Sequence, residues 1–131
     1  TSGGVTPLGT FVALCGALLI GVIAFLFEAL QSAIANAGAN VFFSWQTIVI
    51  GAIAGLVGSL FDSVLGATIQ ATYYCDFDQK ETESAIHRCG RATRRIRGWR
   101  WFDNDWVNFI ASMFGSFVAL AVHLVLVGPS F

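Results

Sequence analysis

The stretch Gly58-Ser-Leu-Phe-Asp-Ser-Val-Leu-Gly-Ala-Thr-Ile-Gln70 ends an apolar run that begins at Thr47, and this run decides the fold. The run is long enough to cross the hydrocarbon core of a bilayer as a helix, which takes about 20 residues. It nevertheless contains the carboxylate of Asp62, although no Lys or Arg lies between Thr1 and Gln79. A charged side chain inside a membrane costs about 2.5–3.5 kcal/mol even on lenient scales. Asp62 is therefore predicted to serve a function.

Helical periodicity places several small or polar residues on one face together with Asp62. These residues are Ser59, Ser63, Gly66 and Gln70. Gly66 would let another group, such as a bound phosphate, approach the backbone closely. A structural role is the alternative, in which Asp62 forms a hydrogen bond to a neighbouring helix and holds the two helices together. Both roles remain open from the residues alone.

The composition indicates one membrane module that occupies the whole chain, 1–131. Hydrophobic residues make up 56% of the sequence and charged residues only 11%, which is unlike a soluble domain. Apolar stretches predict three transmembrane helices, at about 8–29, 47–72 and 107–127. Each contains a row of small residues four positions apart, which favours close packing of helices. We therefore predict an all-α membrane protein with three transmembrane helices and one polar loop at 75–105.

The charges are concentrated in that loop. All seven basic residues lie there: Lys80, Arg88, Arg91, Arg94, Arg95, Arg97 and Arg100. The positive-inside rule predicts that the 80–100 segment faces the cytosol, or the stroma or matrix if the membrane belongs to an organelle. With three spans, residues 1–7 would face the same side. Three polar segments would then converge: the N-terminal Gly-Gly turn, the 58–70 stretch and Asp103–Asn108.

These converging groups suit the handling of phosphate with a divalent metal. Oxygen ligands of the kind that hold Mg²⁺ come from Asp62, Asp103, Asp105 and Asn108. Backbone N–H groups at the start of the first helix could bind phosphate, at Ser2, Gly3, Gly4 and Thr6. The loop arginines could contact phosphate oxygens or anionic lipid head groups. Two structural alternatives stay open: Asp103-Asn-Asp105 as a helix cap and the basic loop as a determinant of topology.

The three cysteines do not predict a disulfide framework, because their number is odd. Cys75, His87 and Cys89 supply three zinc ligands, but no fourth follows at a regular spacing, so no zinc site is predicted. A P-loop, a Rossmann glycine pattern and a nucleophile elbow are all missing from the sequence. No nucleic acid is expected as a partner.

Three motifs together resemble one integral membrane family, which includes the phytyl-phosphate kinase of plants and transmembrane protein nineteen of animals. They are Thr1-Ser-Gly-Gly-Val-Thr-Pro-Leu-Gly9, the 58–70 stretch, and Phe102-Asp-Asn-Asp-Trp-Val-Asn108. The resemblance covers most of the chain. It implies an enzyme that phosphorylates a prenyl monophosphate using a nucleoside triphosphate. Residues that match the polar motif positions of the family are Asp62, Ser63, Gly66, Gln70, Asp103, Asn104 and Asn108; catalytic roles are implied for Asp62, Ser63, Gln70 and Asp103.

The chain departs from the family in two ways. Asp105 stands where the family usually has Asn, which adds a negative charge near a possible phosphate. The resemblance also covers only the C-terminal half of the family, because an acidic motif of the Asp-Thr-x-Ala-Ser-Glu type is not found. Since the chain opens on Thr1, we expect an N-terminal portion to be missing. Half of such a site should not be catalytic alone.

Two functions therefore compete. The first is a membrane module of a prenyl-phosphate kinase, whose partners are the lipid bilayer and a prenyl lipid phosphate, with Mg²⁺ as cofactor. Its prenyl tail would lie against Val64, Leu65 and the 109–117 region. The second is a catalytically incomplete accessory subunit that packs against other transmembrane helices in a larger complex. A small channel or half of a transporter, supported by Asp62 alone, is the third possibility.

Overall fold

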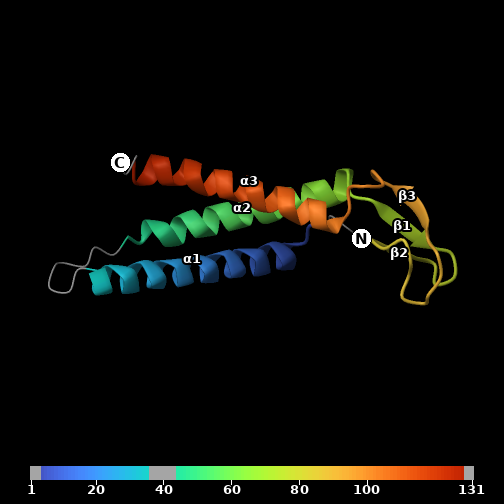
Figure 1. Ribbon diagram of the computed structural model, residues 1–131, viewed down its shortest axis with the longest axis horizontal. Helices are drawn as coiled ribbons and strands as arrows, with labels where there is room; N and C mark the ends of the chain where they lie inside the picture. Colours follow the sequence, from blue (N-terminus) through green and yellow to red (C-terminus); the bar gives the residue numbers. More distant parts are fainter. Residues whose placement is uncertain (1–3, 36–43, 129–131) are drawn as a thin grey trace. The chain divides into compact units, whose positions relative to one another are not determined.

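The computed structural model describes residues 4–35 and 44–128, and three helices make up most of them (Figure 1). A small sheet lies along the chain between the second helix and the third. The elements in order are α1 Pro7–Ala35, α2 Gln46–Thr68, β1 Thr72–Cys75, β2 Lys80–Thr82, β3 Arg94–Arg97 and α3 Asn104–Leu126.

The three predicted membrane spans are confirmed as helices. They contain 29, 23 and 23 residues and are each long and apolar enough to cross a membrane. At about 1.5 Å per residue, the shorter two extend about 34 Å, which exceeds a hydrocarbon core of about 30 Å. The first helix begins at Pro7, because proline suits a position whose N–H has no partner within the helix.

The second helix ends at Thr68, short of the predicted end of its span. Beyond this point the backbone pairs with a distant part of the chain. Trp99 donates its N–H to the carbonyl oxygen of Ile69 at 3.0 Å, and Ala71 donates to that of Phe102 at 2.8 Å. These long-range hydrogen bonds satisfy backbone groups that a longer helix would otherwise use, so hydropathy alone overestimated its length.

The predicted all-α membrane fold is confirmed, and the predicted polar loop at 75–105 adds a small three-stranded antiparallel sheet to it. The strand order is β2-β1-β3, and Tyr73 in β1 pairs with Thr82 in β2 and with Arg95 in β3. Strands of three or four residues are too short to show a clear alternation of apolar and polar side chains. In addition, β3 has the sequence Arg-Arg-Ile-Arg, which resembles a solvated run of charge.

The chain divides into two compact units. The helical unit contains α1, the first part of α2 and the last part of α3, in the ranges Pro7–Ser59 and Gly115–Phe131. The loop unit contains the last turns of α2, the sheet and the first turns of α3, in the range Leu60–Phe114, together with the residues before Pro7.

Small residues bring the helices close together within the helical unit. A Cβ atom at Gly51 would lie 2.8 Å from the Cα of Gly21, and one at Gly55 would lie 2.7 Å from the Cβ of Ala17. Ala17 and Gly21 are buried. A Cβ at Gly115 in α3 would likewise lie 3.4 Å from a backbone oxygen of α2. The predicted packing through small residues is therefore confirmed for these helices.

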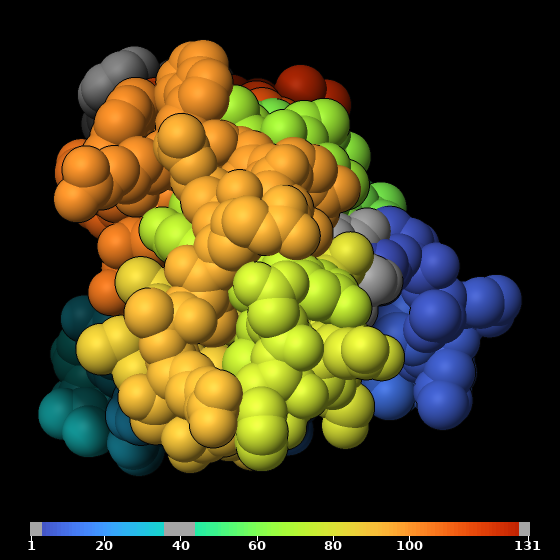
Figure 2. Space-filling view, turned by 90° about the vertical axis from the view of Figure 1, so that its right-hand side faces the viewer, coloured from blue at the N-terminus to red at the C-terminus, as the bar shows by residue number. Residues whose placement is uncertain are grey.

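The loop unit has a small apolar core where α2 meets α3. Leu65, Phe102 and Val107 are buried there, and Phe61 stacks on Phe114 with ring centroids 4.2 Å apart. The sheet contributes little to this core, because β2 and β3 have no buried residue. Figure 2 shows the surface of the sheet, with β3 and its flanking loops running alongside the segment that contains β1.

Candidate functional site

The last turns of α2 carry the polar stripe that the sequence predicted. Asp62 and Ser63 are partly buried, and Gly66 and Gln70 are buried. Asp62, Ser63 and Gly66 lie in the last turns of α2, and Gln70 follows the end of the helix at Thr68. Leu65 belongs to the apolar core of the loop unit. The stripe therefore combines a carboxylate, a hydroxyl and an amide at the end of α2.

Gln70 is the least expected member of this stripe. Only 2% of the residue is exposed, and among the residues that the structure describes nothing accepts a hydrogen bond from its Nε2 atom. Buried polar groups in proteins nearly always have a partner, and leaving one unpaired costs about 1–3 kcal/mol. The Nε2 atom of Gln70 is thus available to bind a group that the described residues do not supply.

The backbone around Gln70 is held by the residues after β3. Gly98 has a φ of 78°, a conformation that favours glycine. A Cβ atom there would lie 2.0 Å from the carbonyl oxygen of Gln70. Glycine is therefore required at this point for the loop to reach the end of α2.

Arg97 is the basic residue that reaches the polar stripe. Its Nη2 atom donates to the carbonyl oxygen of Gly66 and to Oγ1 of Thr72, both at 3.4 Å. Gly66 lies in the last turn of α2, where carbonyl groups lack partners within the helix and the helix dipole favours a cation. Sequence reasoning treated the seven basic residues alike, and only the fold distinguishes Arg97.

Glu83 is a second residue that sequence reasoning missed. It follows β2, and its carboxylate interacts electrostatically with that of Asp62. Carboxylate oxygens are the ligands that a divalent cation such as Mg²⁺ prefers. No signal in the sequence links Asp62 and Glu83, because 21 positions separate the two residues along the chain (83 − 62).

Asp103 caps the third helix. Its Oδ1 atom accepts hydrogen bonds from the backbone N–H groups of Asp105 and Trp106, at 3.1 and 3.2 Å. The capping interpretation of Asp103-Asn-Asp105 is therefore confirmed. Asn104, Asp105 and Asn108 are exposed. Their predicted role as metal ligands, together with that of Asp103, stays a prediction.

The predicted phosphate-binding turn lies only partly within the described residues. Ser2 and Gly3 lie outside them, whereas Gly4 and Thr6 are described and exposed. Gly4 and Thr6 belong to the loop unit, as do Asp62 and Asp103. All three polar segments that were expected to converge therefore contribute to one compact unit.

The sheet of the loop unit gathers a further group of side chains. Cys75, His87 and Cys89 lie close together with Asp78, and their potential ligand atoms are all within 4.8 Å of one another. The sequence suggested the first three residues and offered no fourth. Asp78 escaped notice because an acidic residue in a polar loop has no distinguishing spacing of its own.

Comparison with known proteins agrees with the membrane fold. The family described as integral membrane protein DUF92 matches residues 1–116. Protein PGR of Arabidopsis thaliana is 34% identical over 118 residues, which are 90% of this chain and 39% of that protein. The chain thus spans well under half of this relative. No solved structure matches.

Proposed function

Because the chain belongs to the integral membrane protein DUF92 family, we propose that it supplies part of the active site of a phosphotransferase in the membrane. The acceptor would be the monophosphate of a prenyl lipid, and the donor a nucleoside triphosphate. The substrate class comes from the resemblance to phytyl-phosphate kinases. The residues of the loop unit and their arrangement support the proposed phosphoryl transfer without reference to that resemblance.

The observation that carries this proposal is the polar stripe at the end of α2. Asp62 interacts electrostatically with a second carboxylate, Glu83, and the Nε2 atom of Gln70 is buried without a partner among the described residues. Arg97 adds a guanidinium within hydrogen-bonding distance of Gly66. Carboxylates, an amide donor and a guanidinium together match what a metal-bound phosphate requires.

Each residue would have a distinct task in phosphoryl transfer. Mg²⁺ held by Asp62 and Glu83 would offset the negative charge of the phosphate groups. Gln70 would donate a hydrogen bond to a phosphate oxygen from a site without competing water. Arg97 would place a positive charge beside the same oxygens. Phosphoryl transfer depends mainly on such positioning and electrostatic stabilisation.

The hydrophobic tail of the substrate would lie on exposed apolar side chains of the loop unit. Val64 is 54% exposed and Phe109 is 56% exposed. Leu65, which we expected to contact the tail, is instead buried against Phe102 and Val107. That expectation was wrong, because Leu65 is needed for the contact between α2 and α3.

The test uses the full-length protein in detergent or liposomes. Transfer of phosphate from CTP or ATP to phytyl or geranylgeranyl monophosphate is measured for the wild type and for Asp62→Asn. We expect the variant to be about 10²–10³-fold slower, as when other electrostatic contacts to a transition state are removed. Asp76→Asn is the matched control, because Asp76 is 73% exposed on its side chain and pairs only loosely with Arg94, at 3.7 Å.

Unchanged turnover in Asp62→Asn would contradict the mechanism. Absence of transfer by the wild type with either nucleotide would favour the alternative, an accessory subunit of a larger membrane complex. That alternative predicts stable association of the native protein with other membrane proteins, which gentle extraction and sizing would detect.

A further inference from the structure

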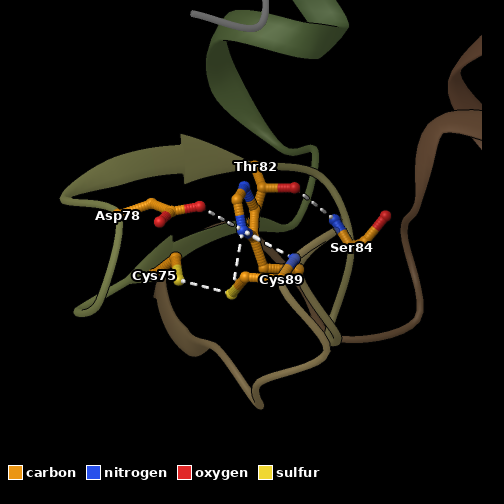
Figure 3. A network of polar contacts seen from close by, with 6 residues as sticks. Cys75, Asp78, Thr82, Ser84 and Cys89 are labelled. Atoms are coloured by element: carbon orange, nitrogen blue, oxygen red, sulfur yellow. Dashed lines mark hydrogen bonds and ion pairs between the residues drawn. The ribbon is translucent and has the colours of Figure 1, made fainter.

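Two turns in the sheet of the loop unit bring four potential metal ligands to one place. Cys75 is the last residue of β1, and Asp78 lies in the turn between β1 and β2. His87 and Cys89 lie in the turn before β3. Figure 3 shows Cys75, Asp78 and Cys89 directed toward a common point. The four residues are Cys75, Asp78, His87 and Cys89. Two sulfurs, one imidazole nitrogen and one carboxylate oxygen are a donor set that suits zinc.

The distances between the ligand atoms agree with a tetrahedral zinc site. The Sγ atoms of Cys75 and Cys89 are 3.7 Å apart, and two thiolates bound to one zinc at about 2.3 Å would lie about 3.8 Å apart. Nδ1 of His87 lies 3.3 Å from Sγ of Cys89 and 3.0 Å from Oδ2 of Asp78. In a tetrahedral zinc site, the nitrogen–sulfur distance would be about 3.5 Å and the nitrogen–oxygen distance about 3.4 Å.

A disulfide agrees less well with the same geometry. Bonded sulfur atoms are about 2.05 Å apart, so Cys75 and Cys89 would have to move much closer than their 3.7 Å separation. A disulfide would also give no role to Asp78 and His87, which approach the same point.

The imidazole of His87 has more neighbours than one nitrogen atom can satisfy. Its Nδ1 lies within reach of the Asp78 carboxylate, the Cys89 thiol and the backbone N–H of Cys89, the last at 3.4 Å. A single ring nitrogen either donates one proton or accepts with one lone pair. A cation at this point would bind the lone pair, the carboxylate and the sulfur at once, and would account for their convergence.

The backbone holds the second pair of ligands in a tight turn. His87 donates its N–H to Arg91 at 2.9 Å, and Gly90 donates to His87 at 2.8 Å. Gly90 has a φ of 80°, and a bridge between Ile86 and Ala92 closes the turn. The position of His87 and Cys89 therefore depends on regular backbone hydrogen bonds.

The strands β2 and β3 and the turns beside them contribute no buried residue to an apolar core that could stabilise them without a metal. Residues 76–97 are all described, and none of them is buried. Cys75 is the nearest buried residue, with 1% exposed. Small folds that cannot bury enough apolar surface are commonly stabilised by disulfides or metals.

We propose that Cys75, Asp78, His87 and Cys89 bind one zinc ion that stabilises the sheet of the loop unit. Four protein ligands fill a tetrahedral coordination sphere, which is typical of a structural site and leaves no position for substrate. Binding would displace the protons of both thiols. The loop is predicted to face a cytosolic, stromal or matrix side; in the cytosol thiols remain reduced. Arg88 and Arg91, in the same turn, would offset the one residual negative charge.

The test measures metal in the purified full-length protein. We expect one zinc per chain in the wild type and a loss of at least about 10-fold in zinc affinity for Cys89→Ser and for Asp78→Ala. Cys15→Ser is the matched control, because Cys15 lies in α1 and outside the cluster. It should retain all the zinc.

A variant that gains zinc affinity tests the proposal even if Cys89→Ser and Asp78→Ala fold poorly. Asp78→Cys would replace a carboxylate with a softer thiolate and should bind zinc more tightly than the wild type. Replacing zinc with cobalt should give the visible spectrum of a tetrahedral thiolate site, with sulfur-to-metal absorption that weakens in Cys89→Ser.

Three results would overturn the proposal. The first is wild-type protein without bound zinc that also fails to take up added zinc or cobalt. The second is zinc loss in Cys15→Ser as large as in Cys89→Ser. The third is mass spectrometry of unreduced protein, purified under cytosolic redox conditions, showing a Cys75–Cys89 disulfide in place of the metal.

Discussion

The helical unit and the loop unit are stabilised in different ways. In the helical unit, small residues such as Ala17, Gly21 and Gly51 allow backbones to approach closely. In the loop unit, a small core is supplemented by hydrogen bonds such as that from Ala71 to Phe102 and by the proposed zinc site. Lipid is as apolar as leucine, so membrane helices associate through close packing. A short polar sheet cannot bury enough surface and requires specific bonds.

The largest effect is expected at the junction between the sheet and α2. Gly98→Ala should lower the free energy of unfolding by about 2–5 kcal/mol, because it combines a left-handed conformation with overlap against Gln70. Gly90→Ala is the control, since Gly90 has a similar φ but nothing within 4 Å of the added Cβ. It should cost only about 1–2 kcal/mol. Thermal unfolding in detergent and trypsin cleavage of the loop measure the stability of both variants. An equal loss of stability in the two variants would contradict the close contact between Gly98 and Gln70.

Packing in the helical unit should respond to one added methyl group. Gly51→Ala should destabilise the protein by about 1–3 kcal/mol through overpacking, because the new Cβ would lie 2.8 Å from Gly21. Gly16→Ala is the matched control in α1, where nothing lies within 4 Å. It should be neutral or slightly stabilising, since alanine favours helices. Unfolding in a graded detergent mixture would compare the stabilities of Gly51→Ala and Gly16→Ala. A neutral Gly51→Ala would show that the helices do not pack this closely.

Asp103 offers a way to separate capping from metal binding. Asp103→Ala should cost about 1 kcal/mol because the N–H groups of Asp105 and Trp106 lose their acceptor. Asp103→Asn keeps a capping oxygen and should preserve stability. If Asp103 also binds Mg²⁺, Asp103→Asn should nevertheless lower phosphotransferase turnover. Full turnover in Asp103→Asn would restrict this residue to the structural role.

The smallest effect is expected for a single hydrogen bond between α1 and α2. The hydroxyl of Thr47 donates to Oε2 of Glu28 at 2.7 Å. Thr47→Val should cost about 0.6 kcal/mol, the average measured for polar contacts between membrane helices. Glu28→Gln retains an acceptor oxygen and should cost less. A loss above that of Gly51→Ala would mean that polar contacts, rather than close packing, dominate the helical unit.

Much of the candidate site could be predicted from local sequence. Asp62 was recognisable because a carboxylate in an apolar run is costly, and Asp103 because Asp-Asn-Asp precedes a helix. Arg97 and Glu83 could not be identified in this way. Each interacts with a residue more than 20 positions away: Arg97 donates a hydrogen bond to Gly66, and Glu83 interacts electrostatically with Asp62. In addition, nothing in the sequence distinguishes Arg97 from the other arginines of the basic loop.

Hydropathy by itself predicted the three helices of the described residues that are long and apolar enough to cross a membrane, because a bilayer imposes the length and the apolar character of each span. Small residues repeated four positions apart likewise indicated how the helices pack. Only the tertiary structure decided where α2 ends, since the backbone just after Thr68 is hydrogen-bonded to residues after β3. It also brought Asp78 to Cys75, His87 and Cys89, because the pairing of short strands sets which turns of a loop meet.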